Sequence, residues 1–314
     1  MRHFLADDDL TPTEQADVLS LAARLKAAPY DFKPLQGPRT VACIYDKHTL
    51  RTQASFAAAI AELGGFALQV DGNLAEIGVR ESVRDVARVL GRQASMIVWR
   101  TYAQEDLEEM GDYAGVPVVN ALTDDFHPCQ LLADLLTVKE HKGELAGLRV
   151  AFVGDGACNM GNSWMVAGAT AGMHIRVSAP PGHNPTDAMV SRAQAIANRT
   201  GGSVALVADP GEAVADADVV VTDTWVSMGK EQEKEARIAA FGSYSVTPDL
   251  LAQAKPDAIV MHCLPAYRGL EIAADVIDGP QSVVWDEAEN RRHAQKAIIA
   301  WLLHHYATPL GADE

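Results

Sequence analysis

Short apolar stretches alternate with amphipathic ones along most of the chain. The apolar stretches have the length of β-strands, and the segments between them carry apolar residues at the spacing of a helix face. In the first half, the predicted strands are Thr40–Tyr45, Phe66–Val70, Met96–Trp99 and Val116–Leu122. The predicted helices are Pro12–Ala28, with Thr11 as its cap, Arg51–Leu63, Glu81–Leu90 and Glu105–Tyr113. This alternation is typical of a parallel sheet.

A longer amphipathic helix, predicted for His127–His141, precedes a second series of the same kind. Its predicted strands are Leu148–Val153, Ile175–Ser178, Val204–Val207, Val219–Thr222, Ile259–Met261 and a last short strand, Ser282–Trp285. A final amphipathic helix is predicted for Asn290–Tyr306. We therefore expect an α/β fold of two doubly wound parallel-sheet domains, joined by the His127 helix and the terminal helix crossing between them.

The expected domain boundaries follow from these two series. The first domain is expected to span residues 1–141 and to be completed by the C-terminal helix at 290–314. The second is expected to span residues 142–289. A chain of this length has ample residues for two cores.

One predicted strand ends in chemically active side chains. The run Ile259–Met261 is followed by His262 and Cys263, and Pro265 cannot extend the strand. Open α/β sheets bind ligands at the carboxyl ends of their strands, which suggests a catalytic role for the thiol and the imidazole. Packing is an equal alternative on position alone, because free cysteine is among the most buried residue types.

Composition excludes several classes of partner and site. A net charge of −16 disfavours non-specific attraction to nucleic acid or to an anionic membrane. The four cysteines show no CxxC spacing, so neither a zinc knuckle nor a disulfide framework is predicted. The N-terminus has no apolar signal core, and no apolar run approaches membrane-spanning length. We expect a cytoplasmic protein.

A glycine-rich turn after the fifth strand departs from the dinucleotide-binding fingerprint, which disfavours a nicotinamide or flavin site. Gly154 and Gly156 match two positions of the fingerprint, but Asn159 stands at the third glycine position. The next strand ends at Ser178 instead of with an acid for a ribose. The turn therefore either presents Asn159 to a small polar ligand, or Asn159 caps its own helix.

A possible anion site lies between the first strand and its helix. Thr49, Arg51 and Thr52 place hydroxyls and a guanidinium at a predicted helix N-terminus, which is what a phosphate group requires. An ordinary capped helix start with a solvated arginine is the alternative. Arg100 ends the third strand, on the same side of the expected sheet.

Two further stretches carry candidate ligand-binding side chains. His127 and Gln130 are one helical turn apart and so share a face. Asp223 follows the very apolar strand Val219–Thr222, where its carboxylate could hold an ammonium group. The nearby Trp225 is more often a packing residue than a recognition residue.

Together these stretches resemble the aspartate/ornithine transcarbamylase family, and most closely its ornithine branch, over nearly the whole chain. The matching motifs are His127-Pro-Cys-Gln130, Asp223-Thr-Trp-Val-Ser-Met-Gly229, His262-Cys-Leu-Pro265 and Glu289-Asn-Arg291. In combination they are highly specific, and Ser-Met-Gly separates the ornithine branch from the aspartate branch.

The resemblance implies a carbamoyl phosphate domain, an amino-acid domain and an active site at their cleft, shared between the subunits of a homotrimer. It implies a transferase that moves a carbamoyl group from carbamoyl phosphate to the δ-amine of ornithine, as in arginine biosynthesis. The implied products are citrulline and phosphate. The implied partners are these small-molecule substrates, with no nucleic acid and no membrane. No metal or organic cofactor is implied.

The resemblance also assigns roles by motif. Residues implied to bind carbamoyl phosphate are Thr49, Leu50, Arg51, Thr52, Glu76, Arg100, His127, Gln130, Cys263, Leu264 and Arg291. Residues implied to hold ornithine are Asn159, Asp223, Ser227 and Met228. The implied catalytic residues are Arg100, His127, Gln130 and Cys263, with Cys263 next to the reacting amine.

The donor side departs from the family pattern. The phosphate loop usually reads Ser-Thr-Arg-Thr-Arg, but here Leu50 replaces a hydroxyl donor and Gln53 replaces a positive charge. Glu76 stands where the family commonly has a Gln that reaches a neighbouring subunit's phosphate, and Arg80 offsets part of that negative charge. Two alternatives therefore stay open: a divergent paralogue with another donor or amine acceptor, and a catalytically silent ornithine-binding or regulatory protein.

Overall fold

The computed structural model describes residues 1–226 and 231–307 and divides the chain into two compact units. Unit 1 comprises residues 1–133 and the segment that begins at Arg291, and unit 2 comprises residues 134–290. Two helices, α6 (Pro128–Lys142) and α13 (Val284–Ala307), contribute residues to both units. Within the described ranges, none of the helices is long and apolar enough to span a bilayer.

Unit 1 contains a four-stranded parallel sheet in the order β2-β1-β3-β4. Its strands are β1 (Thr40–Tyr45), β2 (Phe66–Asp71), β3 (Met96–Arg100) and β4 (Val118–Leu122). After β1 the chain first adds β2 on one side and then returns to add β3 on the other side. The carboxyl ends of β1 and β3 therefore form the topological switch point, where open α/β sheets bind their ligands.

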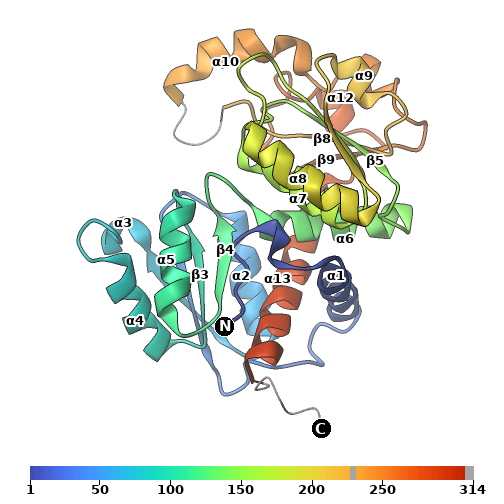
Figure 1. The fold of residues 1–314 in the computed structure, drawn as a ribbon. Coiled ribbons are helices and arrows are strands. Elements are labelled where there is room, and N and C mark those ends of the chain that lie inside the picture. Colours follow the sequence, from blue (N-terminus) through green and yellow to red (C-terminus); the bar gives the residue numbers. More distant parts are fainter. Residues whose placement is uncertain (227–230, 308–314) are drawn as a thin grey trace. The chain divides into compact units, whose positions relative to one another are not determined.

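Helices precede or connect the strands of this sheet (Figure 1). They are α1 (Pro12–Ala27), α2 (Arg51–Glu62), α3 (Gly72–Ala75), α4 (Val83–Gln93) and α5 (Gln104–Ala114), with a short 3-10 turn at Asp7–Asp9. The predicted cap of the first helix is confirmed, because the Thr11 hydroxyl accepts the Glu14 N–H at 3.3 Å. In Figure 1, α4 and α5 lie side by side, and they bury Ala87, Leu107 and Met110 with the inner residues of β1 and β3.

Unit 2 contains a five-stranded parallel sheet in the order β7-β6-β5-β8-β9. Its strands are β5 (Arg149–Val153), β6 (His174–Ser178), β7 (Ser203–Leu206), β8 (Val219–Thr222) and β9 (Ile259–His262). Here the order reverses between β5 and β8, so the second switch point lies where Gly154 and Asp223 follow these strands. The predicted two-domain parallel α/β fold is thus confirmed.

The helices of unit 2 connect these strands. They are α7 (Asn159–Thr170), α8 (Asp187–Thr200), α9 (Pro210–Val214), α10 (Lys234–Phe241), α11 (Pro248–Leu251) and α12 (Ala274–Ile277), with 3-10 turns at Glu231–Glu233 and Gly242–Tyr244. One core cluster joins β5, β8 and β9 to α12 through residues such as Val153, Val220, Val260 and Ile277. Apolar runs with few polar interruptions fit strands that are buried on both faces.

The predicted last strand, Ser282–Trp285, is wrong. Only Ser282 forms a bridge, to Val260, and the Val283 N–H donates to the Val260 carbonyl at 3.0 Å. The helix α13 then begins at Val284, six residues before the predicted start at Asn290. The short apolar run was misassigned because a run of this length fits a strand or a helix turn equally well.

Candidate active site

The loop between β1 and α2 provides a helix N-terminus for an anion. The Thr49 hydroxyl accepts the N–H of Thr52 at 3.3 Å, whereas Leu50, at the N-cap position, contributes no side-chain cap. N–H groups in the first turn of a helix have no partner inside that helix, and the helix dipole adds positive charge there. Arg51 is the first residue of α2. This geometry suits a phosphate group.

Buried cationic and polar side chains surround this loop in unit 1. Arg291 donates through Nη1 to Oε1 of Gln130, and through Nη2 to the Thr52 hydroxyl at 3.5 Å. Arg100, at the end of β3, donates to the His48 carbonyl at 3.4 Å. Arg100, Gln130 and Arg291, which come from three distant segments, therefore meet at the loop that carries His48 and Thr52. Their burial strengthens hydrogen bonds to a negatively charged ligand.

His127 is held as a neutral imidazole beside this cluster. Burial, followed by the positive charges of Arg291, Arg100 and Lys47, lowers its pKa well below the ordinary value of 6.5. A neutral imidazole can donate a hydrogen bond without bringing another charge to the site. Lys47 is itself buried, and burial lowers its pKa although its ammonium group pairs with Asp124.

The residues that depart from the family pattern lie at the surface of unit 1. Leu50 is 75% exposed, and Gln53 and Glu76 are exposed as well. Glu76 follows α3 with a φ of 47°, a conformation that non-glycine residues adopt infrequently. Exposed side chains contribute little to packing. Their departures from the family pattern therefore change little in the packing of unit 1.

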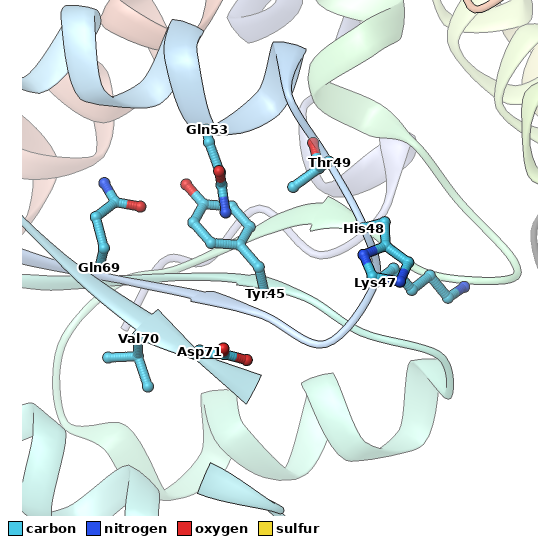
Figure 2. Close-up of a pocket in the computed structure, with 8 residues that line it drawn as sticks. All are labelled: Tyr45, Lys47, His48, Thr49, Gln53, Gln69, Val70 and Asp71. Atoms are coloured by element: carbon cyan, nitrogen blue, oxygen red, sulfur yellow. The ribbon is translucent and has the colours of Figure 1, made fainter. Parts of the chain in front are cut away.

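A cavity of about 460 Å³ opens on the β2 side of the donor loop (Figure 2). Figure 2 shows Gln53 reaching from α2 toward the ring of Tyr45, and Gln69 pointing to the same space from β2. Burial raises the pKa of Tyr45, so its hydroxyl stays protonated. The cavity is lined by Tyr45, Lys47, His48, Thr49, Gln53, Gln69, Val70 and Asp71. It is a polar pocket contiguous with the predicted phosphate loop.

In unit 2, Asp223 and Cys263 follow two paired strands. Thr222 at the end of β8 lies opposite His262 at the end of β9, which brings the next residue of each strand together. Oδ1 of Asp223 accepts the N–H of Thr224 at 2.7 Å and the thiol of Cys263 at 3.2 Å. The carboxylate is thereby oriented by two donors at the switch point of the sheet.

The protonation of this pair follows from its burial. Burial raises the pKa of Asp223, and a bound ammonium group would lower it again. Burial, followed by the negative charge of Asp223, raises the pKa of the Cys263 thiol well above its usual value. Cys263 is therefore a neutral hydrogen-bond donor at neutral pH, and a thiolate nucleophile is disfavoured.

Asn159 is the first residue of α7, next to the switch point. The interpretation that Asn159 caps its own helix is wrong, because Cys158 occupies the cap position and its Sγ accepts the Gly161 N–H at 3.5 Å. The other two predicted ornithine residues, Ser227 and Met228, lie outside the described residues.

Arg237 is a residue of this region that the sequence did not single out. Its guanidinium donates to Asp155 at 2.7 Å, to the Trp225 carbonyl at 3.0 Å and to Glu233 at 2.7 Å. It thus ties the turn after β5 to the loop after β8. Asp155 and Arg237 are 82 positions apart, so no local pattern could have paired them.

One group of side chains among the described residues has the composition of a metal site. Asp223, His262 and Cys263 each offer a ligand atom, and these atoms lie within 4.8 Å of one another. Both ring nitrogens of His262 are already engaged, with the Leu264 N–H at 2.9 Å and with Glu271 at 3.2 Å. A metal ion on His262 would have to displace one of these contacts. The residues fit a hydrogen-bond network better than a preformed metal site.

Comparisons with known proteins match both halves of the chain. The model of the aspartate/ornithine carbamoyltransferase carbamoyl-P binding domain matches residues 2–140, and that of the Asp/Orn binding domain matches residues 146–302. The ornithine carbamoyltransferase of Clavibacter michiganensis is 60% identical over 302 residues, which are 96% of this chain and 98% of that protein. The ornithine carbamoyltransferase of Leifsonia xyli is 59% identical, over 96% of this chain and 97% of that protein.

Solved structures agree with these matches. The ornithine carbamoyltransferase from Pyrococcus furiosus has a TM-score of 0.92 at 43% identity, covering 96% of this chain and 97% of that one. The anabolic ornithine carbamoyltransferase from Campylobacter jejuni has a TM-score of 0.91 at 36% identity, covering 97% of this chain and all of that one. The chain belongs to the aspartate/ornithine carbamoyltransferase family.

Proposed function

We propose that this protein is an ornithine carbamoyltransferase, which moves the carbamoyl group of carbamoyl phosphate to the δ-amine of ornithine and yields citrulline and phosphate. The observation that carries this proposal is that relatives of that name are 52–60% identical over almost the whole chain. Identity of this extent favours the transferase over a paralogue with another donor and over a silent binding protein.

Unit 1 is proposed to hold the donor. Thr49, Arg51 and Thr52, together with the Leu50 N–H, would bind the phosphate at the N-terminus of α2. The observed contacts of Arg291 with Thr52 and Gln130 support this role, because they aim a buried guanidinium at that loop. Glu76, from a neighbouring subunit as the family resemblance implies, would approach the phosphate. It would weaken donor binding through its negative charge.

Unit 2 is proposed to hold ornithine. Asp223 would pair with the α-ammonium group, and Asn159, Ser227 and Met228 would contact the remaining polar groups. The support is the position of Asp223, a buried carboxylate at the switch point of the sheet. An ammonium ligand would supply the positive charge that a buried carboxylate requires.

The proposed chemistry is direct attack of a neutral amine on the carbamoyl carbon. Arg100 and His127 would donate to the oxygen that gains negative charge, and Gln130 would orient the carbamoyl amide. The carbonyls of Cys263 and Leu264 would accept from the same amide. As the C–O bond to phosphate breaks, the attacking nitrogen would pass one proton to the departing phosphate, which leaves as hydrogen phosphate. Arg51 and Arg291 would stabilise its two negative charges.

The oligomeric state is part of the proposal. We propose a homotrimer with shared active sites, with three times the 33.6 kDa of one chain. The exposed apolar residues Leu50, Leu74 and Val79 of unit 1 support a covering subunit, because they are 75%, 76% and 86% exposed. Light scattering of the purified protein would test this mass.

A turnover assay tests the proposed reaction. Purified protein with carbamoyl phosphate and ornithine is expected to form citrulline and phosphate in equal amounts, and to form no carbamoyl-aspartate when aspartate replaces ornithine. An Asp223→Asn variant serves as the matched control for the amino-acid side. Absence of citrulline at saturating concentrations of both substrates would refute the proposed function.

A further inference from the structure

The backbone after β9 makes a turn that is unfavourable for its residue. Leu264 has a φ of 59°, in the left-handed region, where the Cβ atom of a non-glycine residue crowds the backbone. Such a conformation persists only where surrounding contacts impose it. Leu264 is also the residue between Cys263 and Pro265, in the segment that carries two proposed carbamoyl-binding carbonyls.

One side-chain contact that holds this turn comes from His262. The Leu264 N–H donates to Nδ1 of His262 at 2.9 Å. Because a backbone N–H can only donate, Nδ1 must be unprotonated, and the ring proton lies on Nε2. Nε2 faces Oε1 of Glu271 at 3.2 Å, and both side chains are 0% exposed.

The imidazole is fixed from two further directions. Oε1 of Glu271 also accepts the Tyr267 N–H at 2.5 Å, so the carboxylate cannot turn away without losing a second donor. The His262 N–H donates to Oε2 of Glu287 at 2.9 Å, which holds the backbone at the end of β9. Glu271, His262 and Leu264 therefore form one continuous chain of hydrogen bonds, which is fully buried at Glu271 and His262.

We infer that His262 is a positioning residue, which holds Leu264 in its left-handed turn and thereby aims the carbonyls of Cys263 and Leu264 and the Cys263 thiol. Glu271 sets the tautomer of His262. The inference rests on the proposed function, and it assigns His262 no contact with either substrate. A misplacement of about 1 Å at reacting groups costs on the order of 100-fold in rate, which is the effect that His262 prevents.

Two substitutions each retain one of the two ring contacts of His262 and remove the other. In His262→Asn, the amide oxygen lies as many bonds from Cα as Nδ1 does, so it keeps the acceptor for the Leu264 N–H and loses the contact with Glu271. In His262→Gln, the amide nitrogen occupies the place of Nε2, so it keeps the donor to Glu271 and loses the acceptor. The inference predicts that kcat/KM falls about 10- to 100-fold in the Gln variant and clearly less in the Asn variant.

A second change tests the turn itself. Glycine adopts a positive φ without strain, so Leu264→Gly removes the need for the hydrogen bond and retains the carbonyl. Adding Leu264→Gly to the Gln variant is expected to recover about tenfold in kcat/KM, whereas adding it to the Asn variant gives no gain. Additive losses in both backgrounds would overturn the inference, because a merely stabilising histidine would not couple to one backbone conformation.

Hydrogen exchange provides a readout that does not require turnover. Peptides that contain the Leu264 amide should exchange faster in His262→Gln than in the wild type or His262→Asn, and equal rates in all three would also overturn the inference. His174→Gln, which removes a bond to Ser203 in the same unit, is the control and should leave both measurements unchanged. If the wild type forms no citrulline, the proposed function fails, and the exchange result still decides the positioning role.

Discussion

Replacing Arg237 by Met removes a buried guanidinium that ties together two segments of unit 2. The Arg237 side chain is 6% exposed, and its partner Asp155 is 1% exposed. Removing one partner of a buried ion pair costs about 3–5 kcal/mol, because the other charge is left buried and unpaired. The second acid, Glu233, is 56% exposed, so water reaches one side of the group. We therefore expect the lower end, about 3 kcal/mol in the free energy of unfolding.

A double-mutant cycle measures this pair. Urea unfolding is followed for the wild type, Arg237→Met, Asp155→Asn and the double variant. Because the double variant leaves no buried charge unpaired, it should be less destabilised than the sum of the single variants, by at least about 1 kcal/mol. In the folded protein, Arg237→Met should raise KM for ornithine more than KM for carbamoyl phosphate, since Asp155 and Trp225 flank the proposed amino-acid residues. The reasoning would be refuted if the losses in the free energy of unfolding were strictly additive and Arg237→Met alone cost less than about 1 kcal/mol.

Four further outcomes are expected. Asp223→Asn should weaken ornithine binding by about 1.5–3 kcal/mol in calorimetry, while carbamoyl phosphate binding stays unchanged. Cys263→Ser should be impaired but active, and mass spectrometry should find no carbamoylated Cys263 during turnover. The pKa of His127 is lowered on folding, so the unfolded chain binds a proton first as the pH falls below about 6.5. The free energy of unfolding should therefore drop by up to about 1.4 kcal/mol per pH unit, and urea unfolding at several pH values should show a shallower dependence on pH for His127→Gln. Glu76→Gln should tighten carbamoyl phosphate binding at low salt and Leu50→Thr should add about 1 kcal/mol, whereas no change at any ionic strength would contradict an altered donor site.

Buried strands and the chemistry at their ends could be predicted from the sequence. Each predicted strand that the structure confirms is a short apolar run, and Arg100, Asp223 and Cys263 lie at or directly after such runs. A parallel sheet brings the carboxyl ends of its strands to one edge, so position along the chain already indicates the site. Assignment failed at Ser282–Trp285, where Val284 and Trp285 begin a helix instead of continuing a strand.

Contacts that hold the site in shape could not be predicted. The partner of Arg237 depends on how α10 packs near the turn after β5, and that packing leaves no mark on local periodicity. Glu271 is close to His262 in sequence, but the residues between them follow no regular element that would point both side chains inward. The cap at Cys158 was missed because cysteine is an unusual N-cap residue and the adjacent Asn159 is a common one.

Titration calorimetry in two steps tests the central claim, that unit 1 accepts carbamoyl phosphate despite its altered loop and that unit 2 accepts the amino acid. Carbamoyl phosphate is titrated first, and then 2-aminopentanoic acid, which keeps the α-ammonium and carboxylate of ornithine but lacks the reacting amine. We predict saturable carbamoyl phosphate binding that is lost in Arg51→Gln. Because the family resemblance implies that the donor binds first, we also predict that the amino acid binds more tightly once carbamoyl phosphate is bound. Amino-acid binding of equal strength in both states, with no heat from carbamoyl phosphate at any concentration, would contradict the account.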